Sequence, residues 1–291
     1  MYFLKSLLVT IVLMTNTSTI NDSLIADSCF PENDLYISAD NKMMTMSKET
    51  FDHVIDVVEE VYSPIIKERG GELQVERKWE SGTVNAYAQR VGKIYKVSMF
   101  GGLARHKTVT PDGFALVVCH EVGHHIGGAP KKKSWWGSAW ASNEGQADYW
   151  GTTKCLKKVF KILKEEEQDY EDKDYIFAEK ECDKRFEDQE GKALCLRASM
   201  AGKSLAGLFK DLRKMKKDIH FYTPSKKKVS KTFHSHPAAQ CRMDTYFAGS
   251  LCSKSVEDEV SDTDESKGVC YRGQGFELEA RPLCWFKSGS K

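Results

Sequence analysis

Two histidines and a glutamate stand in a spacing that suits metal-assisted hydrolysis. The run HEVGH at positions 120–124 places His120 and His124 four residues apart, with Glu121 directly after the first. On a helix, residues four apart share a face, so both imidazoles can bind one ion. Zinc with an open fourth position lowers the pKa of a water, and a neighbouring carboxylate can take the proton. The run therefore predicts a catalytic zinc site with Glu121 as general base.

A second acidic motif can supply the third protein ligand. The run NEGQAD occupies positions 143–148, after a loop rich in Lys and Trp. If Ser142 or Asn143 caps a helix there, Glu144 and Asp148 lie one turn apart on the same side. We expect Glu144 to be a metal ligand and Asp148 to hold a ligand imidazole through its other ring nitrogen.

Together these motifs resemble those of the gluzincin peptidases, in which a His-Glu-x-x-His helix is completed by Glu-x-x-x-Asp on a following helix. The interval from His124 to Glu144 is similar to that of thermolysin. Other motifs look like those of the CAAX-prenyl-protease-type family and its soluble bacterial relatives, namely NAYA at 85–88 and SHP at 235–237, followed by Arg242. The chain lacks the longer insertion common in that family and the membrane spans of its prenyl-protease members, so prenylated substrates are not implied.

The resemblance implies an α+β, zincin-like metallopeptidase domain with a small antiparallel sheet, an active-site helix and a helical C-terminal part. It also implies one catalytic zinc ion and endopeptidase activity on a protein or peptide substrate. His236 is expected to support the oxyanion. Arg242 is expected to brace the site from behind, through Glu144 or Asp148.

Three other interpretations of the histidine motif are weaker. A metzincin needs a third histidine at position 130, which is Pro130, and His125 points about 100° around the helix from His124. A structural zinc site normally has four protein ligands and needs no carboxylate base beside the metal. The main alternative is a catalytically inactive zincin-fold module that binds protein without cutting it.

Helices are predicted on both sides of the motif. Apolar residues recur at helical spacing over residues 47–67, with Ser47 as the N-cap. The motif helix is expected to open at Thr110 and to end at Gly127, and the helix that carries Glu144 to reach Leu163. The later helical stretches are predicted at 176–215, interrupted around 189–192, and from near Pro237.

Three short stretches with strand character lie between the first two helices, near residues 73–78, 83–89 and 93–100. The turn signals between them predict an antiparallel sheet. We expect residues 93–100 to form the sheet edge nearest the metal, where backbone groups can pair with an extended peptide.

Export is predicted from the N-terminus and the cysteines. Lys5 precedes the apolar run SLLVTIVLM at 6–14, which is typical of a signal peptide. We expect a signal peptide at 1–26, a metallopeptidase domain at 45–250, and a disulfide-held extension at 251–291. The protein is then periplasmic or secreted, and an uncleaved signal anchor is the one expected route to a membrane.

Nine cysteines leave one without a partner if the rest form disulfides. Cys119 is expected to be that free thiol, because it lies inside the apolar motif helix. Neighbours in sequence give plausible pairs, although eight cysteines allow 105 connectivities. These pairs are Cys182 with Cys195, Cys241 with Cys252, and Cys270 with Cys284.

Charge gives little indication of a partner. The chain has 43 basic and 42 acidic residues, so no overall field favours nucleic acid or an anionic membrane. In the loop before Glu144, Trp135, Trp136 and Trp140 either line the substrate site or order the loop. The short basic runs at 131–133 and 226–228 either attract acidic substrates or, as is usual for such runs, form solvated surface.

Overall fold

The computed structural model describes residues 28–40, 46–132, 140–164 and 171–289. The expected signal peptide and both Trp135 and Trp136 lie outside these ranges. Within them, no helix is long and apolar enough to cross a membrane.

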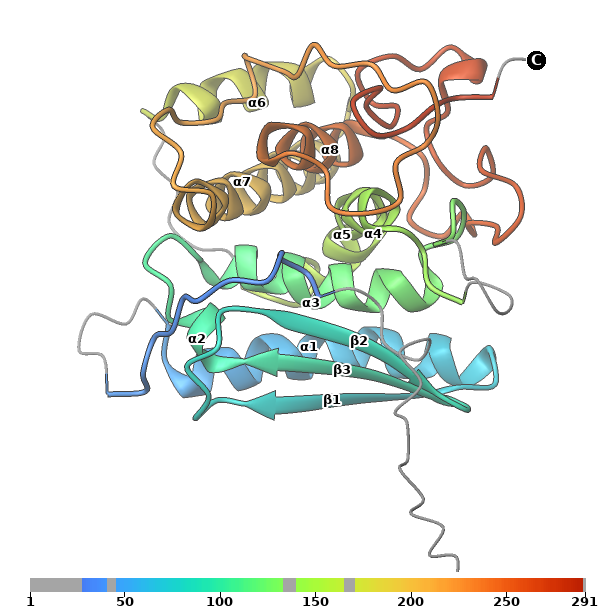
Figure 1. Cartoon of the computed structure of the whole chain (residues 1–291). Coiled ribbons are helices and arrows are strands. Elements are labelled where there is room, and N and C mark those ends of the chain that lie inside the picture. The colour runs from blue at the N-terminus through green and yellow to red at the C-terminus, as the bar shows by residue number, and fades with distance from the viewer. Residues whose placement is uncertain (1–27, 41–45, 133–139, 165–170, 290–291) are drawn as a thin grey trace, which may run out of the picture.

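The first helix packs behind a three-stranded sheet (Figure 1). Helix α1 (Lys48–Glu68) begins as expected, because the Ser47 side chain accepts a hydrogen bond from the Thr50 amide. Its apolar face joins the core through residues such as Phe51 and Ile55, which are fully buried. Strands β1 (Glu72–Lys78), β2 (Ala86–Val91) and β3 (Ile94–Phe100) follow.

The sheet is mixed, which corrects the expected antiparallel arrangement. Its order is β1-β3-β2, with β3 antiparallel to β2 but parallel to β1. Turn signals showed where the chain reverses, but strand burial decides which strands become neighbours. β3 carries three consecutive buried residues and lies in the centre. The expectation that residues 93–100 form an edge is therefore wrong, and the edge that contacts the motif helix is β2.

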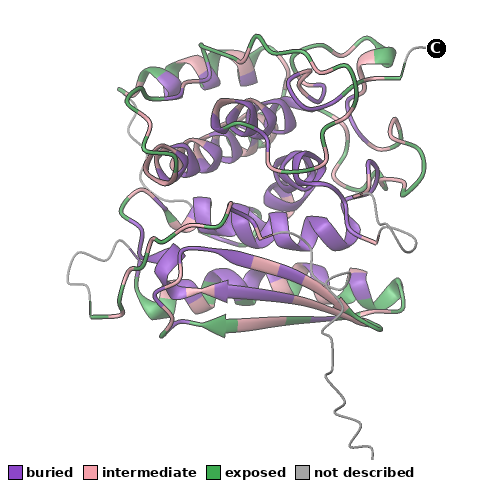
Figure 2. Ribbon diagram, viewed as in Figure 1, coloured by how far each residue is buried: buried purple, intermediate pink, exposed green. Residues whose placement is uncertain are grey.

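Helix α3 (Pro111–Ile126) carries the HEVGH motif between the sheet and the helical half of the molecule (Figure 1). Its first turn is capped by the Thr110 side chain, which accepts a hydrogen bond from the Gly113 amide. All residues of α3 after Pro111 are buried, as Figure 2 shows. Burial on every side explains why its sequence is apolar all round, and it places the motif in the interior.

The helical half follows the predicted order. Its elements are α4 (Glu144–Trp150), the π-helical turn η2 (Gly151–Cys155), α5 (Leu156–Val159), α6 (Lys173–Asp183), α7 (Gln189–Leu212) and α8 (Ala239–Leu251). A four-residue α2 (Gly101–Ala104) precedes α3, and a 3-10 turn η3 (Arg272–Gln274) lies near the C-terminus. The helix expected to reach Leu163 ends at Val159, and the expected interruption falls just before Gln189.

Four disulfides connect eight of the nine cysteines, and Cys29 is the free one. The pair Cys182–Cys195 is confirmed. The other two expected pairs are wrong, because the bonds are Cys241–Cys284 and Cys252–Cys270. Cys119 is not free but bonded to Cys155, since α3 and η2 pack side by side. Four disulfides indicate folding in an oxidising compartment.

Candidate metal centre

Two helices bring the three expected ligands together. His120 and His124 lie one turn apart on α3, and Glu144 is the first residue of α4. α4 can approach α3 closely because Gly123 has no side chain. A Cβ there would lie 3.0 Å from the Trp150 ring and 3.2 Å from the Ala147 carbonyl oxygen.

Hydrogen bonds join Ser142, just before α4, to His124 near the end of α3. The Ser142 amide donates to the His124 carbonyl oxygen at 2.9 Å. In return, Nδ1 of His124 donates to the Ser142 carbonyl oxygen at 2.8 Å, which leaves Nε2 of that ring free of a proton for an ion. Asn143 caps α4 by accepting from the Gln146 amide at 2.9 Å. These contacts fix where Glu144 starts the helix.

The ligand atoms converge on a common point. The Glu144 carboxylate lies 3.3 Å from Nε2 of His120 and 3.6 Å from Nε2 of His124. All three side chains are fully buried. Within the described ranges, neither Nε2 has a hydrogen-bond partner, and the Glu144 carboxylate accepts no hydrogen bond although Lys132 forms an ion pair with it. Buried polar atoms are costly without partners, and a cation between the two rings and the carboxylate would satisfy them. This group could hold a metal ion.

Lys132 reaches the same carboxylate, so the expectation that residues 131–133 are solvated surface is wrong at this position. Its Nζ lies 2.9 Å from Oε1 of Glu144, and its side chain is only 17% exposed. Burial alone would raise the pKa of Glu144, but His124 and Lys132 hold it well below its ordinary value. Glu144 is therefore ionised, as a metal ligand must be.

Asp148 supports His120 from the far side. Its Oδ1 lies 2.7 Å from Nδ1 of His120, so the other ring nitrogen faces the ligand group. Arg242 on α8 donates to both Asp148 oxygens, at 2.8 and 2.6 Å. Although burial opposes ionisation, Arg242 and His120 lower the pKa of Asp148 to about 2. The structure thus places Arg242 behind the site, and of the two expected partners it pairs with Asp148.

Glu121 is fully buried beside the ligand group. Neither of its oxygens has a hydrogen-bond partner among the described residues. Burial raises the pKa of Glu121 to about 8. A carboxylate with these properties can exchange a proton near neutral pH, which is what a general base requires.

His125 turns away from the ligand group. Its Nε2 contacts the Lys96 carbonyl oxygen at 3.1 Å, and its ring stacks between Tyr95 and Trp140. Trp140 therefore packs in an aromatic layer beside the sheet.

His236 and the N-terminal segment complete the surroundings of the ligand group. Nε2 of His236 lies 3.5 Å from Oε2 of Glu144 and donates to the Ser28 carbonyl oxygen at 2.6 Å. Burial lowers the pKa of His236, which favours the neutral ring. His236 therefore stands beside the ligands while it binds a backbone carbonyl.

The backbone of residues 28–30 is held from two sides. The Cys29 amide donates to the Ala86 carbonyl oxygen at 3.0 Å, and Phe30 exchanges two hydrogen bonds with the Asn85 side chain, both at 3.1 Å. On the other side, Arg242 donates to the Cys29 carbonyl oxygen at 2.6 Å. Hydrogen bonds from the start of β2 and from helix α8 thus hold the main chain of residues 28–30 next to the ligand group.

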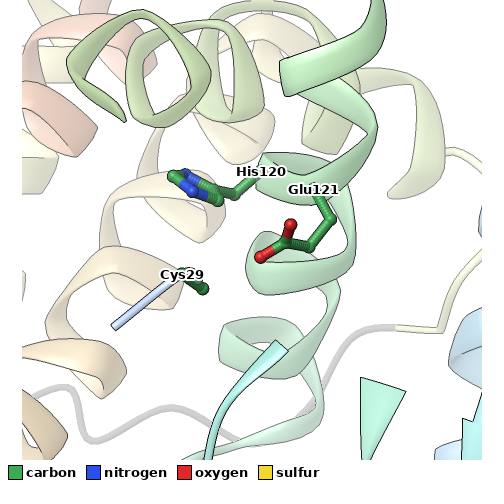
Figure 3. A group of neighbouring side chains, drawn as sticks. All are labelled: Cys29, His120 and Glu121. Carbon is green, nitrogen blue, oxygen red and sulfur yellow. The ribbon is translucent and has the colours of Figure 1, made fainter. Parts of the chain in front are cut away.

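The sequence did not place two of the residues at this site, Cys29 and Lys132, beside the ligand group. Cys29 lies beside His120 and Glu121 (Figure 3), yet it is far from both in sequence. The only signal for Cys29 was the odd number of cysteines, which does not say which one is left over. Lys132 belongs to a basic run of a kind that is usually exposed, but here Lys131 and Lys132 pair with residues 141 and 142 next to the end of α3.

Comparisons with known proteins give no assignment. No family model, no curated protein and no solved structure matches this chain.

Proposed function

We propose that this protein is a zinc-dependent metalloendopeptidase that hydrolyses peptide bonds in exported or extracytoplasmic proteins. The observation that carries the proposal is the buried group of His120, His124 and Glu144, with Glu121 unpartnered next to it. Two imidazoles and one carboxylate form the ligand set of catalytic zinc sites that keep one position open. Bound zinc would supply the Lewis acidity that polarises a carbonyl and lowers the pKa of a water.

Glu121 carries the proton in this mechanism. Its free carboxylate oxygens accept a proton from the attacking water and pass it to the leaving amine. Because Glu121 follows His120 directly in sequence, it projects beside the ligand group without being part of it.

His236 is the proposed donor to the developing oxyanion. Its contact with the Ser28 carbonyl oxygen shows that the ring can bind a peptide carbonyl at this location. A peptide is also the favoured substrate class, because Asn85, Ala86 and Arg242 already hold main-chain groups of residues 28–30 there. The four disulfides support an exported location, periplasmic or secreted.

The proposal is tested by comparing zinc-loaded parent and Glu121→Gln proteins on a peptide library with mass-spectrometric detection of the cleavage sites. Glu121→Gln is expected to lower the rate by at least about 10²-fold, because the base is lost. Zinc content should stay at one ion per chain, since no ligand changes. The matched variant Glu144→Ala should lose zinc as well as activity. Equal cleavage by the parent and Glu121→Gln proteins would exclude the mechanism.

A further inference from the structure

The peptide bond between Ser28 and Cys29 lies beside the candidate metal group. Its carbonyl oxygen accepts a hydrogen bond from Nε2 of His236 at 2.6 Å, and that nitrogen lies 3.5 Å from Oε2 of Glu144. One imidazole therefore contacts both this peptide bond and a carboxylate of the metal group. Because His236 is the proposed oxyanion donor, the Ser28 carbonyl oxygen occupies the position that the mechanism gives to a carbonyl under attack.

The nitrogen of the same bond belongs to a residue next to the proposed base. Cys29 is fully buried, and its sulfur lies within 4.8 Å of a carboxylate oxygen of Glu121 and of a ring nitrogen of His120 (Figure 3). The sulfur itself accepts a hydrogen bond from the Arg242 guanidinium at 3.9 Å, and we assign it no part in metal binding. On hydrolysis of this bond the Cys29 nitrogen is the leaving amine, and Glu121 is the group proposed to protonate it.

Hydrogen bonds on the C-terminal side of the bond fix its position. The Cys29 amide donates to the Ala86 carbonyl oxygen at 3.0 Å, and the Cys29 carbonyl oxygen accepts from Arg242 at 2.6 Å. Phe30 exchanges two hydrogen bonds with the Asn85 side chain, and its own side chain is fully buried. Sliding the chain by one residue would break these contacts. A bond held in this way beside its catalytic groups needs no binding step, and such intramolecular reactions are fast.

We propose that the protein hydrolyses its own Ser28–Cys29 bond, so that its own N-terminal segment is a substrate of the site. This inference rests on the proposed function. The oxygen of a water forms a bond with the Ser28 carbonyl carbon while Glu121 takes a proton from that water. The carbon–nitrogen bond then breaks, and Glu121 passes the proton to the Cys29 nitrogen. Ser28 is left with a carboxylate and Cys29 with a free amine, and water is the one co-reactant. The released part includes whatever remains of the predicted signal peptide at 1–26.

Isotope labels can follow this one bond, because Cys follows Ser at a single place in the chain. With ¹³C in the serine carbonyls and ¹⁵N in the cysteines, the full chain gives one carbon–nitrogen peptide correlation in an NMR spectrum. The chain is prepared with its disulfides in the presence of a chelator, and zinc is then added in excess. The correlation should disappear, and the new N-terminus should read Cys29-Phe30-Pro31. The rate should be the same after tenfold dilution, because the bond and the base belong to one molecule. An intact bond in the zinc-loaded parent protein, or a rate that falls on dilution, overturns the proposal.

Glu121→Gln supplies a measurement that does not depend on cleavage. This variant should process the bond at least about 10²-fold more slowly, since the base is lost. Its correlation should stay sharp with bound Zn²⁺ and broaden strongly with bound Co²⁺, because a paramagnetic ion relaxes nearby nuclei. A correlation that stays sharp in the cobalt-loaded variant overturns the proposal, since the bond then lies far from the ion. The matched control is Glu187→Gln, which makes the same change at an exposed residue between α6 and α7 and should be processed like the parent.

A peptide library distinguishes failure of this proposal from failure of the proposed function. If the zinc-loaded parent cleaves library peptides but keeps the Ser28–Cys29 bond, self-cleavage is overturned and the peptidase function stands. If it cleaves neither, both fail. If it cleaves Ser28–Cys29 and no library peptide, self-cleavage stands and the wider range of exported substrates fails.

Discussion

At the scale of single residues, His236 contacts both the ligand group and a backbone carbonyl. Nε2 of His236 donates to the Ser28 carbonyl oxygen and lies near Glu144. A neutral ring that donates from this nitrogen is suited to a carbonyl oxygen that becomes negative during attack. A role confined to loop packing would give the same burial but no dependence of the chemical step on the donor.

Replacing His236 by Phe separates these roles. We expect His236→Phe to lower kcat by about 10²- to 10³-fold, as loss of one oxyanion donor does. KM should change less, and zinc content should equal that of the parent, because His236 is not one of the three expected ligands. Steady-state kinetics with metal analysis measures both. A kcat near the parent value in the folded, zinc-loaded variant would remove His236 from the catalytic residues.

The residues of the candidate metal group could be predicted from sequence, because metal chemistry restricts their spacing locally. Two histidines that share an ion must lie on one helix face, so their spacing is visible in the chain. Glu144 and Asp148 follow the same helical rule. Cys29 obeys no such rule, because its contact with α3 depends on how the N-terminal segment crosses β2 and α8. Contacts of that kind leave no periodic signal.

At the scale of secondary-structure elements, the helix ends were more predictable than the strand pairing. Ser47, Thr110 and Asn143 each cap a helix with a side-chain oxygen, and that interaction is local. Pairing of β1 with β3 joins segments that a turn does not connect. This pairing depends on the burial of β3 in the centre of the sheet, and the alternation of polar and apolar residues in the sequence does not show which strand is central.

The disulfide between Cys119 and Cys155 should matter to the metal site more than its position outside the ligand group suggests. It ties α3, next to His120, to η2, which continues from α4. Closing a loop of 36 residues stabilises the fold by about 3–4 kcal/mol. Replacing both cysteines by Ala should lower the free energy of unfolding by about that amount and also weaken zinc binding.

A matched control for this prediction is the pair Cys182 and Cys195, which joins α6 to the start of α7. Its loop of 13 residues predicts a loss of about 3 kcal/mol on double replacement by Ala. Zinc affinity should stay at the parent value in this control, because neither helix supplies a ligand. Urea unfolding and competition with a zinc chelator measure the two quantities. Equal zinc affinity in both double variants would show that the first disulfide does not position the ligands.

At the scale of the whole molecule, the segment after α8 is attached to the helical half by buried lysines. Lys157 on α5 is 4% exposed, and its Nζ donates to the Cys252 carbonyl oxygen at 2.8 Å. Burial lowers the pKa of Lys157 to about 7 from its ordinary value of 10.5. A neighbouring positive charge on Lys154 adds to this shift.

This shift predicts a dependence of global stability on pH. Between about pH 7 and pH 10 the unfolded chain keeps the Lys157 proton that the folded protein has lost, so stability should rise with pH in this window. Lys157→Met removes the contribution. The difference in unfolding free energy between parent and variant should move in favour of the parent by on the order of 2 kcal/mol from pH 7 to pH 9. Urea unfolding at both pH values measures it, and a constant difference would show that Lys157 does not change protonation on folding.

Pairing of the C-terminal cysteines also belongs to this scale, and sequence proximity predicted it poorly. The bond Cys241–Cys284 spans 43 residues and encloses Cys252–Cys270. Short loops close more easily in a flexible chain, but the folded protein selects pairs by where the packed segments meet. Residues 284–286 meet α8, whereas Cys252 lies beyond the end of that helix.

Trp285, close to the C-terminus, packs on the helix that carries Glu144. Its ring covers the first turn of α4, so closely that a Cβ on Gly145 would lie 2.3 Å from it, and its Nε1 donates to Thr245 on α8 at 2.9 Å. Gly145 is next to Glu144, so the third ligand gains its final packing only after Trp285 has left the ribosome. Because translation starts at the N-terminus, His120 and His124 are made long before Trp285 is available to pack on α4. The order of emergence therefore leaves the candidate metal group without its final packing until the polypeptide is almost entirely made.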